Sequence, residues 1–217
     1  MAITVGYLTD QAATKYLDEA GDDISESAWL KYYNLAQAMI VGLVPSAFAT
    51  GVLLDLVAGV VQSLPAYTVE LIDIPMNMPA GVPGAPIRET ATDIMNECCP
   101  GWTQEAASAT VEHFMRIPGN NMQIMVYPRN DGNGKVLAQI ARTPDPVIDD
   151  ADDAWKNQPL ALGDKYAGAL LNAMMFNAYD EDSDSPGNAV RSDIHYNRLL
   201  QSLGLKEARQ TKREASK

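Results

Sequence analysis

The chain has 217 residues, with 28 acidic residues against 16 basic ones and a formal net charge of −12. Hydrophobic residues make up 47% and charged residues 20%, a composition typical of a folded globular chain rather than a disordered one. The acidity argues against an ordinary DNA- or RNA-binding protein, because contacts to phosphates need clustered Lys and Arg. Two cysteines cannot build a disulfide framework, which excludes a small secreted protein held together by disulfides.

Three helices are predicted in the N-terminal part of the chain, after which the pattern changes. A short first helix is followed by a second that starts at a serine cap, Ser25 or Ser27, and runs to about residue 43. The third covers about residues 49–64, where apolar side chains recur at helical spacing. Pro45 separates the second helix from the third, because proline interrupts the hydrogen bonds of a helix interior.

Residues 32–54 contain no charged side chain, and a stretch of that length could cross a bilayer. Pro45 divides the stretch near its middle, and polar residues interrupt it. The apolar residues of the second helix form one stripe, which is typical of a helix packed on one side against a protein core. The residues of the stripe are Trp29, Tyr33, Ala36, Ile40 and Val44. Two packed helices are therefore favoured, and membrane association through residues 32–54 is the alternative.

The middle of the chain is predicted to be rich in strands. Its elements are a strand at 67–74, an irregular Pro-rich loop at 75–86, a helix at about 87–98 and a strand at 111–117. A hairpin then joins residues 123–128 to residues 135–141 through the turn Asp131-Gly132-Asn133-Gly134, whose residues tolerate the positive φ of such turns.

The C-terminal part returns to helices. A connector rich in Pro and Asp, residues 143–153, precedes a helix at about 160–179 and a last helix at about 188–203. The order of helices, strands and helices predicts an α+β fold, an α-helical bundle with an inserted small antiparallel β region. The predicted domains are one helical domain formed by 1–66 and 142–204, an inserted β-rich region at 67–141, and a basic tail at 205–217.

The sequence contains little that indicates catalysis or metal binding. His113 and His195 lack a His or Cys partner at metal-ligand spacing, and Cys98-Cys99 are adjacent. Asp180, Asp182 and Asp184 match the first three ligands of an EF-hand, but Ser185 and Arg191 stand where the loop needs Gly and Glu. We therefore expect no cofactor and no metal, and the acidic segments are interpreted as solvated turns.

The C-terminal tail differs in charge from the rest of the chain. Residues 205–217 carry five basic groups against two acidic ones, a net charge of +3, which leaves −15 for the remaining residues. A basic tail on an acidic body indicates docking onto an acidic surface, or it is a frayed soluble terminus. The candidate docking residues are Lys206, Arg209, Lys212, Arg213 and Lys217.

The C-terminal half combines four features: the connector TPDPVIDDADD, the helix with Tyr166, Ala169, Leu170 and Tyr179, the turn with Gly187-Asn188, and the helix with Arg191, His195, Tyr196 and Leu203-Gly204. In these features it resembles the phage adaptor family of head-to-tail connector proteins. Cys99-Pro100-Gly101-Trp102 and Met125-Val126-Tyr127-Pro128 are similar to the family as well. The helix residues 172–179 depart from the family, whose helices here are richer in Tyr and Arg.

The resemblance implies a structural virion protein at the head–tail interface, assembled in the host cytoplasm and without enzymatic activity. Its implied partners are other copies of itself in a ring of about twelve, the portal protein, a downstream tail or nozzle protein, and DNA that passes through the ring without specific binding. A membrane is not among them. The acidic body fits a channel wall that repels phosphates. A small soluble enzyme with dispersed catalytic residues is kept as the alternative from another class.

Overall fold

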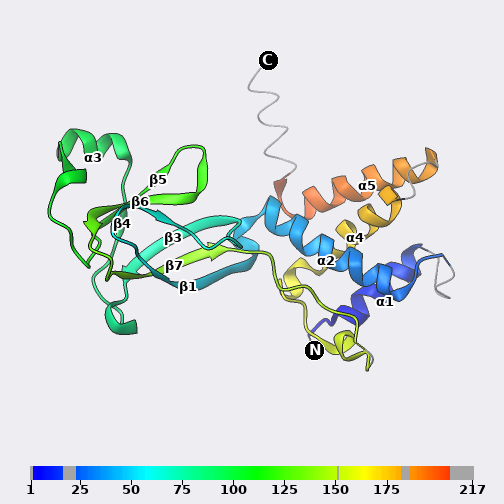
Figure 1. The fold of residues 1–217 in the computed structure, drawn as a ribbon. Helices are drawn as coiled ribbons and strands as arrows, with labels where there is room; N and C mark the ends of the chain where they lie inside the picture. The colour runs from blue at the N-terminus through cyan, green and yellow to red at the C-terminus, as the bar shows by residue number, and fades with distance from the viewer. Residues whose placement is uncertain (1, 17–22, 151, 182–185, 206–217) are drawn as a thin grey trace, which may run out of the picture. The chain divides into compact units, whose positions relative to one another are not determined.

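The computed structural model describes all residues except 1, 17–22, 151, 182–185 and 206–217. The chain divides into two compact units. One unit combines residues 1–47 with residues 143–217, and the other is the continuous segment 48–142. Helices make up the first unit and strands most of the second (Figure 1), so the mixed α+β fold predicted from the sequence is confirmed.

The helical unit is organised around one central helix. Its α-helices, within the described residues, are α1 (Val5–Tyr16), α2 (Glu26–Leu43), α4 (Ala167–Glu181) and α5 (Pro186–Ser202). Helix α4 packs against the other three. Such a position requires apolar or small side chains on most of its surface. The buried residues of α4 are Ala169, Leu170, Ala173, Met174, Met175, Ala178 and Tyr179.

Helix α2 begins and ends where local sequence signals predict. Ser25 is its N-cap, and the Ser25 hydroxyl accepts a hydrogen bond from the backbone N–H of Ala28 at 3.3 Å. The helix ends at Leu43, just before Pro45. The predicted apolar stripe is confirmed at Trp29, Tyr33, Ala36 and Ile40, which are buried, while Val44 is half-buried.

The connector that leads towards α4 is attached to α2 and α1. Both amide atoms of Asn34 on α2 bind the backbone of Val147: Nδ2 donates to its carbonyl at 2.8 Å and Oδ1 accepts from its N–H at 2.9 Å. Near the 3-10 turn η4 (Ala154–Asn157), the N–H of Val5 donates to the carbonyl of Gln158 at 2.9 Å. These contacts hold a Pro-rich segment, which cannot form a regular helix, on the surface of the helices.

The β unit contains two small sheets. Strands β1 (Ala49–Asp55), β7 (Lys135–Ala141) and β3 (Glu70–Asn77) form one sheet in that order. Strands β2 (Gly59–Ser63), β6 (Asn120–Asn130), β5 (His113–Ile117) and β4 (Arg88–Glu89) form the other. All neighbours are antiparallel except β4 and β5, which are parallel. A core of apolar side chains from both sheets lies between them, with Phe114, Ile124, Val126 and Ile140 almost fully buried.

The second sheet is covered by a short helical segment. Helix α3 (Thr92–Cys98) and the 3-10 turn η3 (Trp102–Gln104) supply Met95 and Trp102, which pack against Met115 of β5 in a separate buried cluster. The predicted helix at 87–98 is thus shorter at its start, because residues 88–89 pair with β5 as strand β4.

The predicted helix at 49–64 is wrong, because this segment forms β1 and β2. The spacing of its apolar residues fits both a helix and a strand. In the structure, Val52 and Leu54 pack against the core while Gly51 and Leu53 are exposed, which is the alternation of a strand. Pairing with β7 over the full length of β1 decides that residues 49–55 form a strand rather than a helix. The β unit consequently begins at residue 48, and residues 48–66 belong to it rather than to the helical unit.

The predicted hairpin between residues 123–128 and 135–141 is also wrong. Strands β6 and β7 follow one another but lie in different sheets, and β6 instead forms a hairpin with β5, where Ile117 pairs with Asn120. The segment 131–134 is the bend between the sheets. The buried side chain of Asn130 shapes it, since its Oδ1 accepts from the N–H of Gly132 (2.8 Å) and of Gly134 (3.2 Å).

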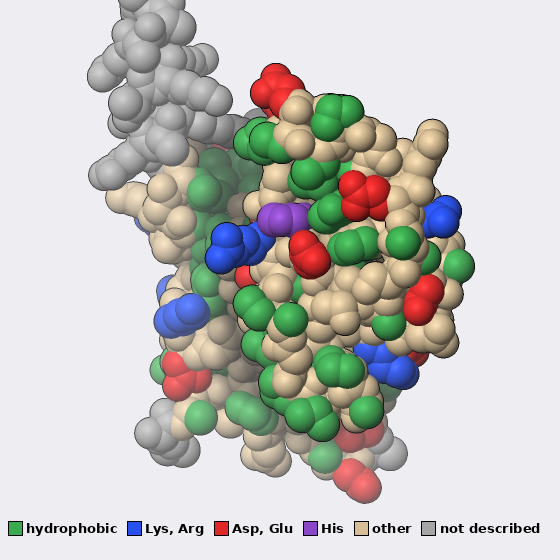
Figure 2. All heavy atoms as spheres, turned by 90° about the vertical axis from the view of Figure 1, so that its left-hand side faces the viewer, with side chains coloured by type: hydrophobic (Ala, Val, Ile, Leu, Met, Phe, Trp, Pro, Cys, Tyr) green, Lys and Arg blue, Asp and Glu red, His purple; other side chains and the backbone are tan. Residues whose placement is uncertain are grey.

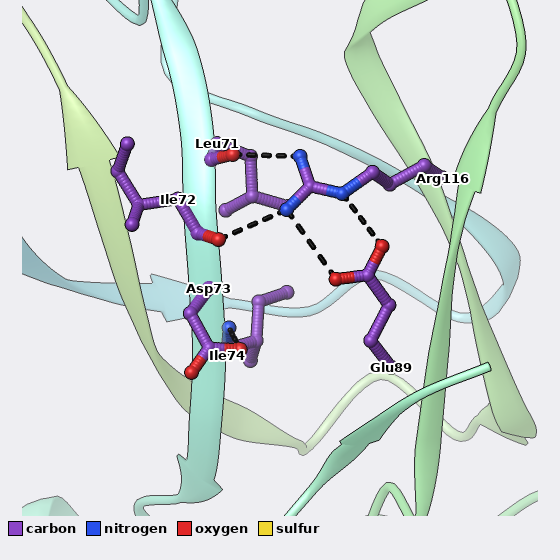
Figure 3. A network of polar contacts seen from close by, with 6 residues as sticks. All are labelled: Leu71, Ile72, Asp73, Ile74, Glu89 and Arg116. Atoms are coloured by element: carbon purple, nitrogen blue, oxygen red, sulfur yellow. Dashed lines mark hydrogen bonds and ion pairs between the residues drawn. The ribbon is translucent and has the colours of Figure 1, made fainter. Parts of the chain in front are cut away.

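Arg116 of β5 connects the two sheets (Figure 3). Its guanidinium donates to the carbonyls of Leu71 (2.6 Å) and Ile72 (2.9 Å) on β3, and its Nε donates to Glu89 of β4 at 2.7 Å. The Arg therefore occupies two backbone acceptors of β3, an edge strand of its sheet.

No helix in the described part of the chain is long and apolar enough to span a membrane. The uncharged residues 32–54 are divided among α2, the 3-10 turn η1 (Pro45–Phe48) and β1.

Candidate functional site

The five candidate docking residues (Lys206, Arg209, Lys212, Arg213 and Lys217) lie outside the described residues. The structure describes the helix that leads to them. Helix α5 ends at Ser202, and Leu205, the first residue of the tail, is the last residue that the structure describes. The candidate site is therefore built from α5, with the tail continuing from it.

Helix α5 is held on α4 by its inner side. Leu199 and Leu200 are buried, and the ring of Tyr196 lies 5.3 Å from that of Phe176. The ring of His195 stacks on Tyr179 of α4 at 5.7 Å. These contacts place α5 firmly against the helical unit, so that its orientation is set before the tail begins.

The outer side of α5 exposes apolar side chains. Val190 and Ile194 are 59% and 43% exposed and stand four residues apart, so they are neighbours on one side of the helix. Arg191 and Arg198 are exposed on the same helix, and the guanidinium of Arg191 lies over the ring of Tyr179 at 5.6 Å. An exposed apolar pair with nearby cations is suited to contact with another protein.

His195 is the titratable group at the centre of the α4–α5 contact. Its Nδ1–H donates to Oδ1 of Asn172 at 3.0 Å, and the Asn172 amide donates to the carbonyl of Gly168 at 2.8 Å. Burial lowers the pKa of His195 below its usual value, and the positive charges of Arg198 and Lys15 lower it further. The neutral imidazole therefore favours the folded helical unit.

We expect the stability of the helical unit to fall in mild acid. Because the pKa of His195 is lower in the folded chain, its contribution to the free energy of unfolding is present above about pH 6.5 and is lost as the pH falls through the folded pKa. His195→Gln, which keeps a side-chain donor, removes this part of the pH dependence between pH 8 and about pH 5. Melting temperatures across that range test it, with His113→Gln as the control that keeps His195; equal slopes for wild type and His195→Gln would contradict it.

The acidic segments offer no assembled metal site in the described residues. Asp149, Asp150, Asp152, Asp153 and Asp180 are exposed, and Asp182 and Asp184 lie outside the described residues. Two of these carboxylates have structural partners: Asp150 accepts from the N–H of Ala154 at 2.8 Å, and Asp153 lies 3.2 Å from Lys156 Nζ. No group of three or more His, Cys, Asp or Glu side chains in the described part of the chain could hold a metal ion.

Calcium is expected to leave the protein unchanged. The described carboxylates of the acidic segments are exposed and form no cluster, and the sequence has Ser185 and Arg191 where an EF-hand loop needs Gly and Glu, so Ca²⁺ is expected to bind too weakly to stabilise the fold. Calorimetric titration of the chelator-treated protein tests this expectation. Micromolar binding together with a rise in melting temperature would contradict it and restore the calcium loop at Asp180–Asp184.

The remaining side chains that could take part in chemistry are His113, Cys98 and Cys99. His113 Nδ1 lies 2.8 Å from the hydroxyl of Thr90, within the β unit. Cys98 is exposed and Cys99 half-buried, and both are free thiols. Two surface hollows of the β unit are lined in part by Arg116, whose guanidinium is already bound to Glu89 and to β3.

Figure 2 shows one face of the molecule, on which hydrophobic side chains lie between acidic and basic ones. The charged side chains are scattered over this face, and the basic ones form no single patch. The exposed pair on α5 could not be predicted from the sequence, because Val190 and Ile194 fit the pattern of any amphipathic helix. The exposed edge of β1 could not be predicted either, because the apolar spacing of that segment also fits a helix.

Helix α5, which packs firmly on α4 and exposes apolar side chains on its outer side, is a surface suited to contact with another protein. Comparison with models of known protein families identifies the family of the chain. The model of the family described as SU10 adaptor protein matches residues 3–216. The chain therefore belongs to the SU10 adaptor protein family, a family of phage adaptor proteins, and the resemblance noted from the sequence is confirmed. No curated protein matches the chain.

Proposed function

We propose that this chain is a head-to-tail connector of the virion, which docks under the portal as a ring of about twelve copies and joins the capsid to a tail or nozzle protein. The observation that carries the proposal is the family match over nearly the whole chain. Membership in an adaptor family implies a structural role in which the protein binds other virion proteins. The adaptor family is structural rather than catalytic, so a catalytic role has no comparable support.

The charge distribution supports a role beside DNA. With the basic tail set apart, the rest of the chain has a net charge of −15. A ring of such subunits repels phosphates, so DNA passes through the lumen without being held. The tail, with its net charge of +3, is then the part suited to an acidic surface on the portal.

The tail is the part of the proposal that is tested most directly. A chain that ends after Gly204 is expected to lose binding to purified portals, and particles assembled with it are expected to lose their DNA. Reversing the charge at Arg209, Lys212 and Arg213 is expected to reproduce the loss, and moderate salt weakens wild-type binding because the attraction is electrostatic. Three exposed basic residues elsewhere (Arg88, Arg129 and Lys165) are the matched control for charge reversal.

The outcomes separate the docking role from a general effect of charge. Loss of portal binding in the tail variant and normal binding in the control variant support docking through the tail. Normal assembly and infectious, DNA-retaining particles from the truncated chain would contradict it. Equal losses in the two charge-reversed variants would show that total charge, and not the tail, governs assembly.

A further inference from the structure

Strand β1 presents an open sheet edge. Its ladder with β7 is bounded by the bonds from Arg142 N–H to the Phe48 carbonyl (3.3 Å) and from Leu56 N–H to the Gly134 carbonyl (2.9 Å). In an antiparallel ladder every second residue faces the partner strand, so the even-numbered residues of β1 bond to β7. The N–H and C=O groups of the remaining residues therefore point away from the sheet. These residues are Ala49, Gly51, Leu53 and Asp55, all of which are exposed.

Two other edge strands, β3 and β4, are covered or short. On β3, Arg116 occupies the carbonyls of Leu71 and Ile72, and Ile87 donates to the carbonyl of Pro75 at 3.0 Å. At the bend between β1 and β2, the buried side chain of Gln62 binds both backbone groups of Val57 at 2.8 Å. Strand β4 has only two residues. By contrast, β1 pairs with β7 over seven residues without a bulge and contains no Pro or Lys.

The edge is also apolar and nearly uncharged. Residues 49–63 contain a single charged side chain, Asp55, and Lys135 Nζ lies 2.6 Å from its carboxylate. Leu53 on this edge and Val57 in the bend that follows it are 58% and 61% exposed. On a chain with a net charge of −12, this is a face where two copies approach without bringing like charges together.

We propose that a second copy of this chain docks on this edge, with β1 of one copy pairing antiparallel to β1 of the other. In one register, the outward N–H and C=O groups of all four residues pair with those of the second copy. Gly51 then lies opposite Leu53 of the second copy, and Ala49 lies opposite Asp55 of the second copy. The Leu53 side chain then covers the glycine of the other copy. The product is one continuous six-stranded sheet made from two three-stranded ones.

Charge favours a second copy in this register. The two Asp55 carboxylates stand at opposite ends of the paired strands, six residues or roughly 20 Å apart, which exceeds the screening length in physiological salt. The contact is isologous, so it closes as a dimer. It is a state of the free protein and does not rest on the proposed ring, whose subunit contacts are heterologous rather than isologous.

Sedimentation velocity of the full-length protein over a concentration series tests the dimer. We expect a monomer–dimer equilibrium that Leu53→Lys weakens by about tenfold or more, because the new charge has no partner at a sheet edge. Val82→Lys is the matched control, since Val82 is a similarly exposed residue (62%) outside the edge, and it leaves the equilibrium unchanged. A wild-type protein that stays monomeric, a closed oligomer larger than a dimer, or equal effects of the two variants would overturn the proposal.

The register is tested by cross-linking, which also serves if Leu53→Lys fails to fold. In a background with Cys98 and Cys99 replaced by Ala, proteins with Gly51→Cys and with Leu53→Cys are mixed under oxidising conditions. Residues that face each other lie within the range of a disulfide, whereas diagonal neighbours are further apart. We expect covalent dimers in the mixture and few in either protein alone. Equal yields in all three samples would overturn the register.

Discussion

Asn77→Ala is expected to lower the free energy of unfolding of the β unit by about 3–4 kcal/mol. The side chain of Asn77, which is only 3% exposed, stands at the end of β3. Its Nδ2 donates to the carbonyls of Val111 (2.7 Å) and Ala85 (3.0 Å), and its Oδ1 accepts from the N–H of Val111 at 2.9 Å. Without the amide, both backbone groups of the buried Val111 lose a partner where water cannot readily replace it.

Chemical denaturation followed by tryptophan fluorescence measures this effect, and Trp102 reports on the β unit. Asn133→Ala is the matched control, because Asn133 is exposed in the bend between the sheets. It is expected to change the free energy of unfolding by less than about 0.5 kcal/mol. If the two substitutions have similar effects, the hydrogen bonds of Asn77 do not hold β3, the segment before β5 and the loop around Ala85 together.

Gly6→Ala and Gly42→Ala are expected to change stability in opposite directions. Both glycines lie in α-helices, where alanine is intrinsically favoured by about 1 kcal/mol. A Cβ on Gly6 would lie 2.7 Å from Cβ and 2.8 Å from the carbonyl oxygen of Lys156, whereas a Cβ on Gly42 would have no atom within 4 Å beyond its chain neighbours and the backbone of its own helix. We therefore expect Gly6→Ala to destabilise the helical unit by about 2 kcal/mol and Gly42→Ala to stabilise it by about 0.5–1 kcal/mol.

Thermal unfolding followed by circular dichroism at 222 nm compares the two variants with the wild-type protein. Comparing Gly6→Ala with Gly42→Ala isolates the effect of the close approach of α1 to η4 on stability, because the chemical change and the secondary structure are the same at both positions. A stabilising effect of Gly6→Ala as large as that of Gly42→Ala would show that α1 and the segment around Lys156 are not in close contact.

Local signals in the sequence predicted several features of the helical unit. The start of α2 depends on one serine hydroxyl, and its end on Pro45, so neighbouring residues are sufficient to place both. The apolar stripe of α2 has a period that only a helix buries. The resemblance to an adaptor family also rests on residues readable in the sequence, and the family match confirms it.

The β unit depended on contacts between distant parts of the chain. Residues 49–63 contain apolar side chains that suit a helix or a strand, and pairing with residues 135–141 and 123–130 decides in favour of strands. The turn at 131–134 has the composition of a hairpin, but the strands on either side of it find other partners. Neither outcome could be derived from nearby residues.

The sequence by itself determined the mixed fold class, the limits of α2, the contrast between an acidic body and a basic tail, and the family. Only the tertiary structure decided that the chain turns from helix to strand at residue 48, that β6 and β7 lie in different sheets, and that β1 is left with an open edge. The physical reason is the range of the interactions. Helix caps and breaks act within one turn of the chain, whereas the partner of a strand can lie about 90 residues away, and it sets which side chains are buried and which backbone groups stay exposed.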